Sequence, residues 1–209
     1  MIDITVVLDK SGSMSSIKDS TIKGYNTFLD KQREFKTKGN VTLVQFNSEN
    51  YTKMDSETIS KATELNSENY KPDGWTPLFD ALGKTIKETG DRLRDSKEKP
   101  DKVVFVIITD GQENSSKEYK QKDIADMIEH QKTKYNWEFL YLGAKQDSFT
   151  EAGNIGLNYG QTMNFSSSNC MYLNVAKSVN RYSAGGDISF TEEERKLQAD
   201  ADSNYDKSL

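Results

Sequence analysis

Four apolar runs stand out along the chain, and all of them are rich in β-branched or aromatic residues. They cover residues 2–8, 41–46, 103–108 and 137–142. The run 103–108 (VVFVII) has no polar position, a pattern typical of a strand that is buried on both faces. The run 2–8 (IDITVVL) alternates at its start and becomes continuously apolar toward Leu8. The pattern therefore predicts four strands, at least one of them covered on both sides.

Between these runs, apolar residues recur at the spacing of an α-helix, with Lys, Asp and Glu on the opposite face. Strands that alternate with helices indicate an α/β domain with a mostly parallel sheet. The polar stretch 48–75 fits one short edge strand at 51–54 and a long loop, and long ordered loops are often functional. The expected helices cover residues 16–36, 77–93, 118–132, about 149–155 and about 169–183, and a further short strand is expected at 162–165.

The end of the chain has a different character. Gly185 and Gly186 interrupt the pattern, and residues 187–209 are charged and nearly without apolar side chains. Thr191 followed by Glu194 is the pattern of a helix N-cap. We expect one domain over residues 1–184 and a charged C-terminal extension over residues 185–209, which forms a short solvated helix and then a frayed tail.

Composition narrows the classes of function. The net charge of −5 and the isoelectric point near 5.1 disfavour a nucleic-acid partner, because phosphate binding relies on Lys and Arg. No stretch approaches the roughly 18 apolar residues of a membrane span, and no basic leader precedes the first run. The single cysteine, Cys170, cannot form an intrachain disulfide. The single histidine, His130, is interpreted as a solvated helix residue. We expect a cytoplasmic protein with no membrane and no nucleic-acid partner.

Oxygen-bearing side chains gather at three strand-to-helix junctions. Residues 9–13 (DKSGS) follow the first strand, residues 109–111 (TDG) follow the third apolar run, and residues 73–77 (DGWTP) lead into a helix. In open parallel α/β sheets, ligands bind beyond the carboxyl ends of the strands, where the strand order reverses. The three junctions are therefore expected to meet at one site.

The residue types at these junctions indicate a metal ion. Asp9 and Asp110 would lie at the ends of buried strands, where two carboxylates repel each other and are costly to remove from water. A cation between them would relieve both effects, and the hydroxyls of Ser11, Ser13 and Thr76 would add neutral oxygen ligands. Oxygen ligands without Cys or His indicate Mg²⁺, with Mn²⁺ or Ca²⁺ as alternatives, rather than Zn²⁺ or copper.

Each junction taken alone also has a purely structural interpretation. An N-cap of the first helix would account for one of the serines at positions 13, 15 and 16. Asp110 followed by Gly111 is by itself an ordinary turn. For Glu113 and Asn114, a helix cap is favoured over a role behind the metal ligands.

The motif set as a whole resembles the von Willebrand factor A domain with its metal-ion-dependent adhesion site. The residues that carry the resemblance are Asp9-x-Ser11-x-Ser13, Thr76 within GWTPLFDAL and Asp110 within ITDG. All five ligand positions of the family pattern are filled.

The resemblance extends over about residues 1–184. It implies a Rossmann-like, three-layer α/β/α fold whose central sheet is mostly parallel with one short antiparallel edge strand. It also implies one divalent cation on the rim of the sheet, held directly or through water by the five residues. In that family, an acidic residue of a partner protein often completes the coordination.

The resemblance and the charge balance together predict a divalent-cation-dependent protein-binding module rather than an enzyme. Lys10, Trp75, Gly111 and Glu113 adjoin the expected ligands and are predicted to form the partner-binding rim, although packing of the long loop explains Trp75 equally well. The missing leader and the missing disulfide favour an intracellular bacterial or bacteriophage member of the family.

An Mg²⁺-dependent phosphoryl-transfer or hydrolase enzyme is the alternative, with Asp9 and Asp110 at the metal and Asp9 as nucleophile. Against it, Ser11 stands where a second acidic residue would serve as general acid, and the chain has no phosphate-binding Gly-Lys motif. A structural role with an unused metal site is a third interpretation.

Overall fold

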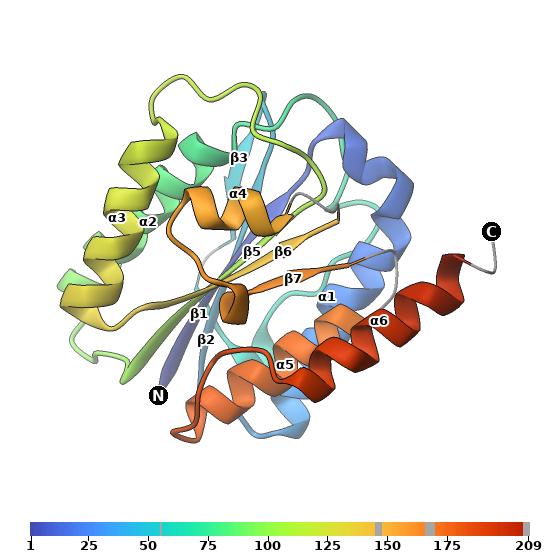
Figure 1. Ribbon diagram of the computed structural model, residues 1–209. Helices are drawn as coiled ribbons and strands as arrows, with labels where there is room; N and C mark the ends of the chain where they lie inside the picture. The colour runs from blue at the N-terminus through green and yellow to red at the C-terminus, as the bar shows by residue number, and fades with distance from the viewer. Residues whose placement is uncertain (55, 145–147, 166–169, 207–209) are drawn as a thin grey trace.

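A mixed β-sheet forms the centre of the molecule, and helices cover both of its faces (Figure 1). The computed structural model describes residues 1–54, 56–144, 148–165 and 170–206. The strands of this part are β1 (Ile2–Asp9), β2 (Gly39–Phe46), β3 (Tyr51–Lys53), β4 (Glu57–Thr58), β5 (Lys102–Thr109), β6 (Glu138–Gly143) and β7 (Thr162–Asn164). They lie in the order β3-β2-β1-β5-β6-β7, with β4 also paired to β2. β1, β2, β5, β6 and β7 are parallel, whereas β3 and β4 run antiparallel to β2.

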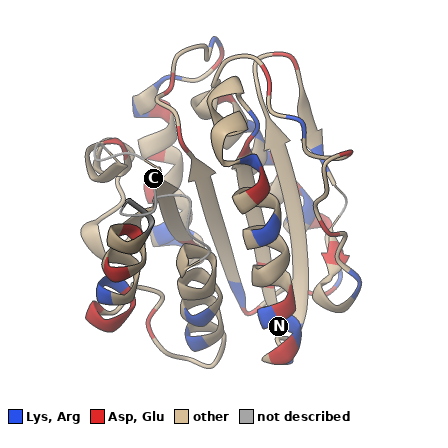
Figure 2. Ribbon diagram, turned by 90° about the vertical axis from the view of Figure 1, so that its right-hand side faces the viewer, with Lys and Arg blue, Asp and Glu red and all other residues tan. Residues whose placement is uncertain are grey.

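The helices form the two outer layers. They are α1 (Lys18–Glu34), α2 (Leu78–Asp95), α3 (Gln121–Tyr135), α4 (Ser148–Asn154), α5 (Cys170–Ser183) and α6 (Glu192–Asp206), with short 3₁₀ turns at Gly12–Ile17, Ile59–Lys61 and Tyr159–Gln161. α1 and α5 pack on one face of the sheet, and α2, α3 and α4 pack on the other. Charged residues concentrate on the helices and loops around the sheet (Figure 2). The three-layer α/β/α fold expected from the sequence is confirmed.

The central strands are apolar because they face two cores. In β5, residues 104, 106 and 108 belong to the core on the α1 and α5 side, and residues 103, 105 and 107 belong to the core on the α2 and α3 side. Every position therefore loses its contact with water, which explains why VVFVII contains no polar residue. No helix in the described part of the chain is long and apolar enough to cross a membrane.

The boundaries of several elements differ from the expectation for identifiable reasons. The first helix starts later, at Lys18, because a 3₁₀ turn precedes it, and it ends before Lys36, which adopts a left-handed φ of 54°. α3 begins at Gln121 because the preceding backbone N–H groups of residues 117–119 donate to the carboxylate of Asp80. The two-residue strand β4 was not expected, since its polar sequence carries no strand pattern. The expected helix start at residue 169 lies outside the described residues.

The C-terminal extension contributes more to the core than its sequence indicates. Ile188 and Phe190 are buried and belong to the core on the α1 and α5 side, so the expectation of a nearly core-free segment is wrong for them. The capping pattern is confirmed, because Thr191 and Glu194 exchange hydrogen bonds of 2.8 and 3.2 Å at the start of α6. The helix is not short as expected, because α6 continues for 15 residues to Asp206, and what remains for the expected frayed tail, residues 207–209, lies outside the described part. The division of the chain at residue 184 stays a prediction.

One buried ion pair ties α2 to the first strand. Asp3 is the polar position in the opening alternation of β1, and its side chain is only 4% exposed. Arg92 of α2 donates to both of its carboxylate oxygens, each at 2.8 Å. The pair compensates the cost of burying this carboxylate.

Candidate metal centre

The candidate site lies where the order of the strands reverses. The chain passes from β1 to β2 on one side and later returns to pair β5 with the other side of β1. Asp9 is the last residue of β1, and Asp110 follows the last residue of β5. Because β1 and β5 are parallel neighbours, these two residues emerge at the same edge of the sheet, the place where α/β folds bind ligands.

Backbone hydrogen bonds join the first loop to the long loop before α2. The N–H of Gly12 donates to the carbonyl of Gly74 at 2.9 Å, and the N–H of Asp73 donates to the carbonyl of Lys10 at 2.9 Å. The buried hydroxyl of Tyr70 donates to the backbone carbonyl of Asp9 at 2.8 Å. These contacts hold the long loop against the end of β1.

The third loop is fixed to the long loop in the same way. The N–H of Asn114 donates to the carbonyl of Thr76 at 3.1 Å, and the side-chain oxygen of Asn114 accepts from the N–H of Thr76 at 2.9 Å. Thr76 is thereby placed beside the loop that carries Asp110. The three junctions expected to meet do so in the structure.

The five predicted ligands converge on one small region. Ser11 and Ser13 share a hydrogen bond between their hydroxyl oxygens at 3.1 Å, and the hydroxyl of Ser13 donates to Asp110 Oδ1 at 2.7 Å. A Cβ atom placed on Gly111 would lie 3.1 Å from Thr76 Oγ1, 3.5 Å from Ser13 Oγ and 3.8 Å from Asp9 Oδ2. The space beside Gly111 is therefore surrounded by oxygen atoms from all three loops, and the missing side chain at Gly111 keeps it open.

Asp9 is the most deeply buried of these residues. Its side chain is inaccessible to solvent, and burial raises the pKa of its carboxyl to about 6. The hydroxyl of Thr109 and the N–H of Ser11, which both donate to the carboxylate at 2.7 Å, lower the pKa in part, and the nearby Asp110 raises it. Within the described residues, no Lys or Arg forms an ion pair with Asp9 or Asp110. Two buried carboxylates therefore lie together, and no basic side chain of the described part is paired with either of them.

The structure does not favour the capping interpretation of the serines. Neither the 3₁₀ turn at Gly12–Ile17 nor α1 receives a side-chain hydrogen bond at its N-cap. The hydroxyl of Ser16 donates backward to the carbonyl of Ser13, and the hydroxyl of Ser13 points to Asp110. The side chains of Ser11 and Ser13 therefore face the candidate site rather than free backbone N–H groups.

The predicted rim residues differ in their surroundings. Lys10 and Gly111 are partly exposed, and Trp75 is 67% exposed. Glu113 is half-buried, and its carboxylate accepts hydrogen bonds from the N–H of Phe79 near the start of α2, from two backbone N–H groups of its own loop, and from a serine hydroxyl, at distances of 2.7 to 2.8 Å. This is the helix-capping interaction that was favoured for Glu113.

Sequence reasoning missed several residues that shape the site. Thr109 supports Asp9, and the hydroxyl of Tyr70 donates to the backbone of Asp9, whereas Asn114, for which a helix cap was favoured, positions Thr76. Thr109 carries a recognisable signal, because it is the polar last residue of an otherwise apolar strand next to Asp110. The roles of Asn114 and Tyr70 depend on contacts between loops that are distant in sequence, and no local pattern reveals them.

The donor set fits a hard divalent cation. Two carboxylates and three hydroxyls offer only oxygen ligands, which Mg²⁺, Mn²⁺ and Ca²⁺ prefer. Among the described residues, no group of three or more His, Cys, Asp and Glu side chains is placed to hold a metal. That part of the chain therefore offers no alternative metal site built from His, Cys or a larger number of carboxylates.

The fold and the position of the site define an α/β domain with its ligand site at the switch point of the sheet. The family model of the von Willebrand factor type A domain matches residues 3–178. The chain therefore belongs to the von Willebrand factor type A (VWA) domain family, whose members are mostly adhesion and interaction modules.

Three solved structures resemble this one at low sequence identity. The pilus adhesin SpaC from Lactobacillus rhamnosus GG has a TM-score of 0.64 and 14% identity, over 87% of this chain and 31% of the adhesin. Proximal thread matrix protein 1 from the mussel byssus, in a structure with a zinc-occupied MIDAS motif, has a TM-score of 0.57 and 18% identity, over 87% of this chain and 45% of that protein. The SpRpn10 VWA domain has a TM-score of 0.54 and 9% identity, over 83% of this chain and 94% of that domain.

These likenesses establish the fold alone. The chain spans less than half of the adhesin and of the byssus protein that it matches. No curated protein matches the chain.

Proposed function

We propose that this protein is a divalent-cation-dependent protein-binding module and not an enzyme. Asp9, Ser11, Ser13, Thr76 and Asp110 would hold Mg²⁺, with Mn²⁺ or Ca²⁺ as alternatives. When bound, the cation would supply a positive centre that an Asp or Glu carboxylate of a partner protein can approach. The observation that carries the proposal is the convergence of oxygen atoms from three loops around two buried carboxylates, neither of which has a basic partner among the residues that the structure describes.

The chain's own residues prepare this site. Thr109 and the backbone of Ser11 fix both oxygens of Asp9, and Ser13 fixes one oxygen of Asp110. The carboxylates carry at most two negative charges, and the three hydroxyls are neutral. The ligand set therefore does not over-neutralise a divalent ion, and a partner carboxylate still gains by approaching it.

The rim supplies further contacts to the partner. The N–H of Trp75 donates to the hydroxyl of Ser48, and the carbonyl of Trp75 accepts from the N–H of Ser48, each at 3.0 Å, while Trp75 as a whole is 67% exposed. A large ring on a fixed backbone binds with little loss of entropy, and Trp is common at the energetic centres of interfaces. We assign Trp75, Lys10 and Gly111 to the contact surface, and Glu113 to the support of the loop behind it.

The proposal includes a cytoplasmic location and the absence of nucleic-acid and membrane partners. The net charge of −5 supports the second point, since a negative chain repels phosphate groups.

Metal binding is tested by calorimetry with a matched pair of serines from one 3₁₀ turn. Ser13 contacts Asp110, whereas Ser15 is exposed and belongs to the same turn. Ser13→Ala should weaken Mg²⁺ and Mn²⁺ binding by about tenfold or more, and Ser15→Ala should leave it unchanged. Equal affinities for the two variants would rule out the proposed ligand set.

Partner binding is tested by affinity capture from the native host in Mg²⁺ and again in EDTA. Proteins retained only with Mg²⁺, and lost with the Asp110→Asn variant, are the expected partners. If the metal binds but no protein behaves in this way, the binding mechanism fails while the metal site stands. Hydrolysis of a phosphate ester that depends on Asp9 would instead favour the enzyme.

A further inference from the structure

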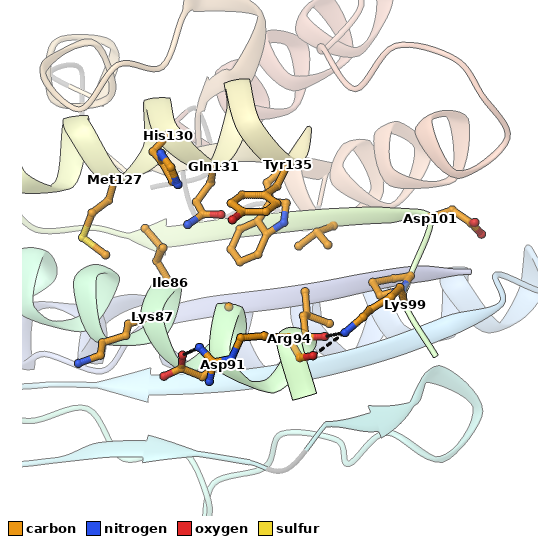
Figure 3. Close-up of a pocket in the computed structure, with 15 residues that line it drawn as sticks. Ile86, Lys87, Asp91, Arg94, Lys99, Asp101, Met127, His130, Gln131 and Tyr135 are labelled. Atoms are coloured by element: carbon orange, nitrogen blue, oxygen red, sulfur yellow. Dashed lines mark hydrogen bonds and ion pairs between the residues drawn. The ribbon is translucent and has the colours of Figure 1, made fainter. Parts of the chain in front are cut away.

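A second concave site lies far from the candidate metal centre, between α2 and α3 (Figure 3). Its volume is about 640 Å³. Val103 near the start of β5 and Trp137 just before β6 line it. It therefore opens at the amino ends of the strands, whereas the metal centre lies at their carboxyl ends. We call it the α2–α3 pocket.

The walls of the pocket are suited to an apolar, flat ligand. Ile86 of α2 and Met127 of α3 approach it from opposite sides, and the rings of His130 and Tyr135 lie along the α3 side (Figure 3). Trp137 is 5% exposed, so its indole is part of the buried lining. A volume between about 300 and 1,000 Å³ with mostly apolar and aromatic walls is typical of sites for small molecules.

Gly90, in the interior of α2, is the feature that packing does not explain. A glycine at such a position destabilises the helix relative to alanine. Two other helical glycines have a clear reason, since a Cβ atom would come within 2.0 Å of Tyr172 at Gly24 and within 2.6 Å of Tyr119 at Gly83. At Gly90, which lines the pocket, a Cβ atom would meet nothing within 4 Å. The physical effect of this glycine is to keep the pocket wide.

Positive charge at the mouth of the pocket is not neutralised. Both acidic residues in the lining are already engaged: Asp91 pairs with Arg94 at 2.7 Å, and Asp101 pairs with the amino group of Met1. Within the described part of the chain, the contacts of the Lys99 ammonium group are with two backbone carbonyls at the end of α2, as the dashed lines in Figure 3 show.

Lys87 is the second lysine of the lining without an ion pair among the described residues. It lines the pocket, and among the described residues its ammonium group has no hydrogen-bond or ion-pair partner. Together with Lys99 it leaves the mouth of the pocket positive, although the protein as a whole carries a net charge of −5. An anionic group on a ligand would therefore be favoured at this position.

We propose that the α2–α3 pocket binds a small aromatic acid. Its ring system lies against Trp137, Tyr135 and Met127, and its anionic group lies at the rim of the pocket, which carries Lys87 at one end and Lys99 at the other (Figure 3). The proposal does not rest on the metal-dependent function, because it uses neither the residues nor the edge of the sheet that form the metal centre.

Two fluorescent probes of matched shape test the proposal. One is 8-anilino-1-naphthalenesulfonate, an aromatic anion, and the other is N-phenyl-1-naphthylamine, its neutral analogue. The folded full chain in EDTA should bind the anion at one site and more tightly than the neutral probe. Asp110→Asn should not change this binding, which separates the result from that of the metal centre.

Substitutions at Gly90 test the location. Gly90→Leu places a side chain in the pocket and should weaken both probes by about tenfold or more. It should also raise Tm by about 2–4 °C, because leucine favours the helix over glycine. The matched control is Gly153→Leu in α4, where a Cβ atom also meets nothing within 4 Å, and it should leave both affinities unchanged. Gly90→Ala is the smaller variant in case the leucine is not accommodated, and it should weaken both probes less.

A substitution at Lys87 tests the charge. Lys87→Gln should weaken the sulfonate roughly 2- to 5-fold and leave the neutral probe unchanged. Equal weakening of the two probes would overturn the preference for an anion. Unchanged binding in both Gly90 variants, or the absence of binding to the wild type, would overturn the pocket as a ligand site. A concentration-dependent dimer that Gly90→Leu abolishes would replace the small molecule by a second copy of the chain.

Discussion

Replacing Asp9 with asparagine measures how much the buried charge at the candidate metal centre destabilises the fold when no metal is bound. The substitution keeps the shape of the side chain and removes its charge. The N–H of Ser11 can still donate to the amide oxygen, and the amide NH₂ can donate to Thr109, whose hydroxyl hydrogen then goes to the carbonyl of Gly111 at 3.0 Å. The hydrogen bonds around position 9 are therefore retained. The difference in the free energy of unfolding between variant and wild type then measures the cost of burying the charge of Asp9.

The sign and size of the effect follow from the raised pKa of Asp9. The pKa is 3.8 in the unfolded chain and about 6 in the folded protein without metal. The folded state therefore binds the proton more tightly, and the stability linked to Asp9 is fully present below pH 3.8 and is lost as the pH rises to about 6. A shift of about 2 units corresponds to about 3 kcal/mol. In EDTA, Asp9→Asn should thus be more stable than the wild type by up to about 3 kcal/mol at pH 7.5 and by much less near pH 4.

Urea unfolding in EDTA at pH 4 and pH 7.5 measures this difference. Glu68→Gln, at an exposed loop carboxylate, is the control and should follow the pH profile of the wild type. With Mg²⁺ at 100 times its Kd, the wild type should gain about 2.7 kcal/mol, and Asp9→Asn should gain little. The reasoning is refuted if the asparagine variant is less stable at pH 7.5 in EDTA, or if its advantage does not depend on pH.

Three further changes test the metal centre, the α2 contact and the C-terminal segment. Gly111→Ala should lower Mg²⁺ affinity by about tenfold in calorimetry, because the added Cβ atom enters the space between the ligands, 3.1 Å from Thr76 Oγ1; full affinity would show that this space is not the metal position. Arg92→Met should cost about 3–5 kcal/mol in urea unfolding, because it leaves a buried carboxylate of β1 unpaired; the exposed Arg94→Met should have a far smaller effect. Phe190→Ala should cost about 3–5 kcal/mol, whereas Leu197→Ala, at a 41% exposed position, should change little; similar values for both would mean that the segment does not support the core.

Local patterns determined the layout of this fold. The apolar runs specify the central strands because a strand between two layers of helices must be apolar on both faces, and VVFVII in β5 is the clearest case. Apolar residues at helical spacing specified the helices of the two outer layers, because a covering helix buries one apolar face against the sheet. Short elements escaped this reasoning, since β4 is two residues long and polar, and its pairing with β2 depends on where the long loop lies.

The sequence alone also determined the chemistry of the site, because the residue types Asp9, Ser11, Ser13, Thr76 and Asp110 restrict it to hard oxygen ligands. Tertiary structure decided that these oxygens meet, through the pairing of β1 with β5 and the hydrogen bonds between the three loops. It also decided which neighbours support them and that Ile188 and Phe190 fold back onto the core. The physical reason is the same in each case. Side-chain chemistry and periodicity are local properties, whereas burial and the packing of loops arise only when distant segments share one surface.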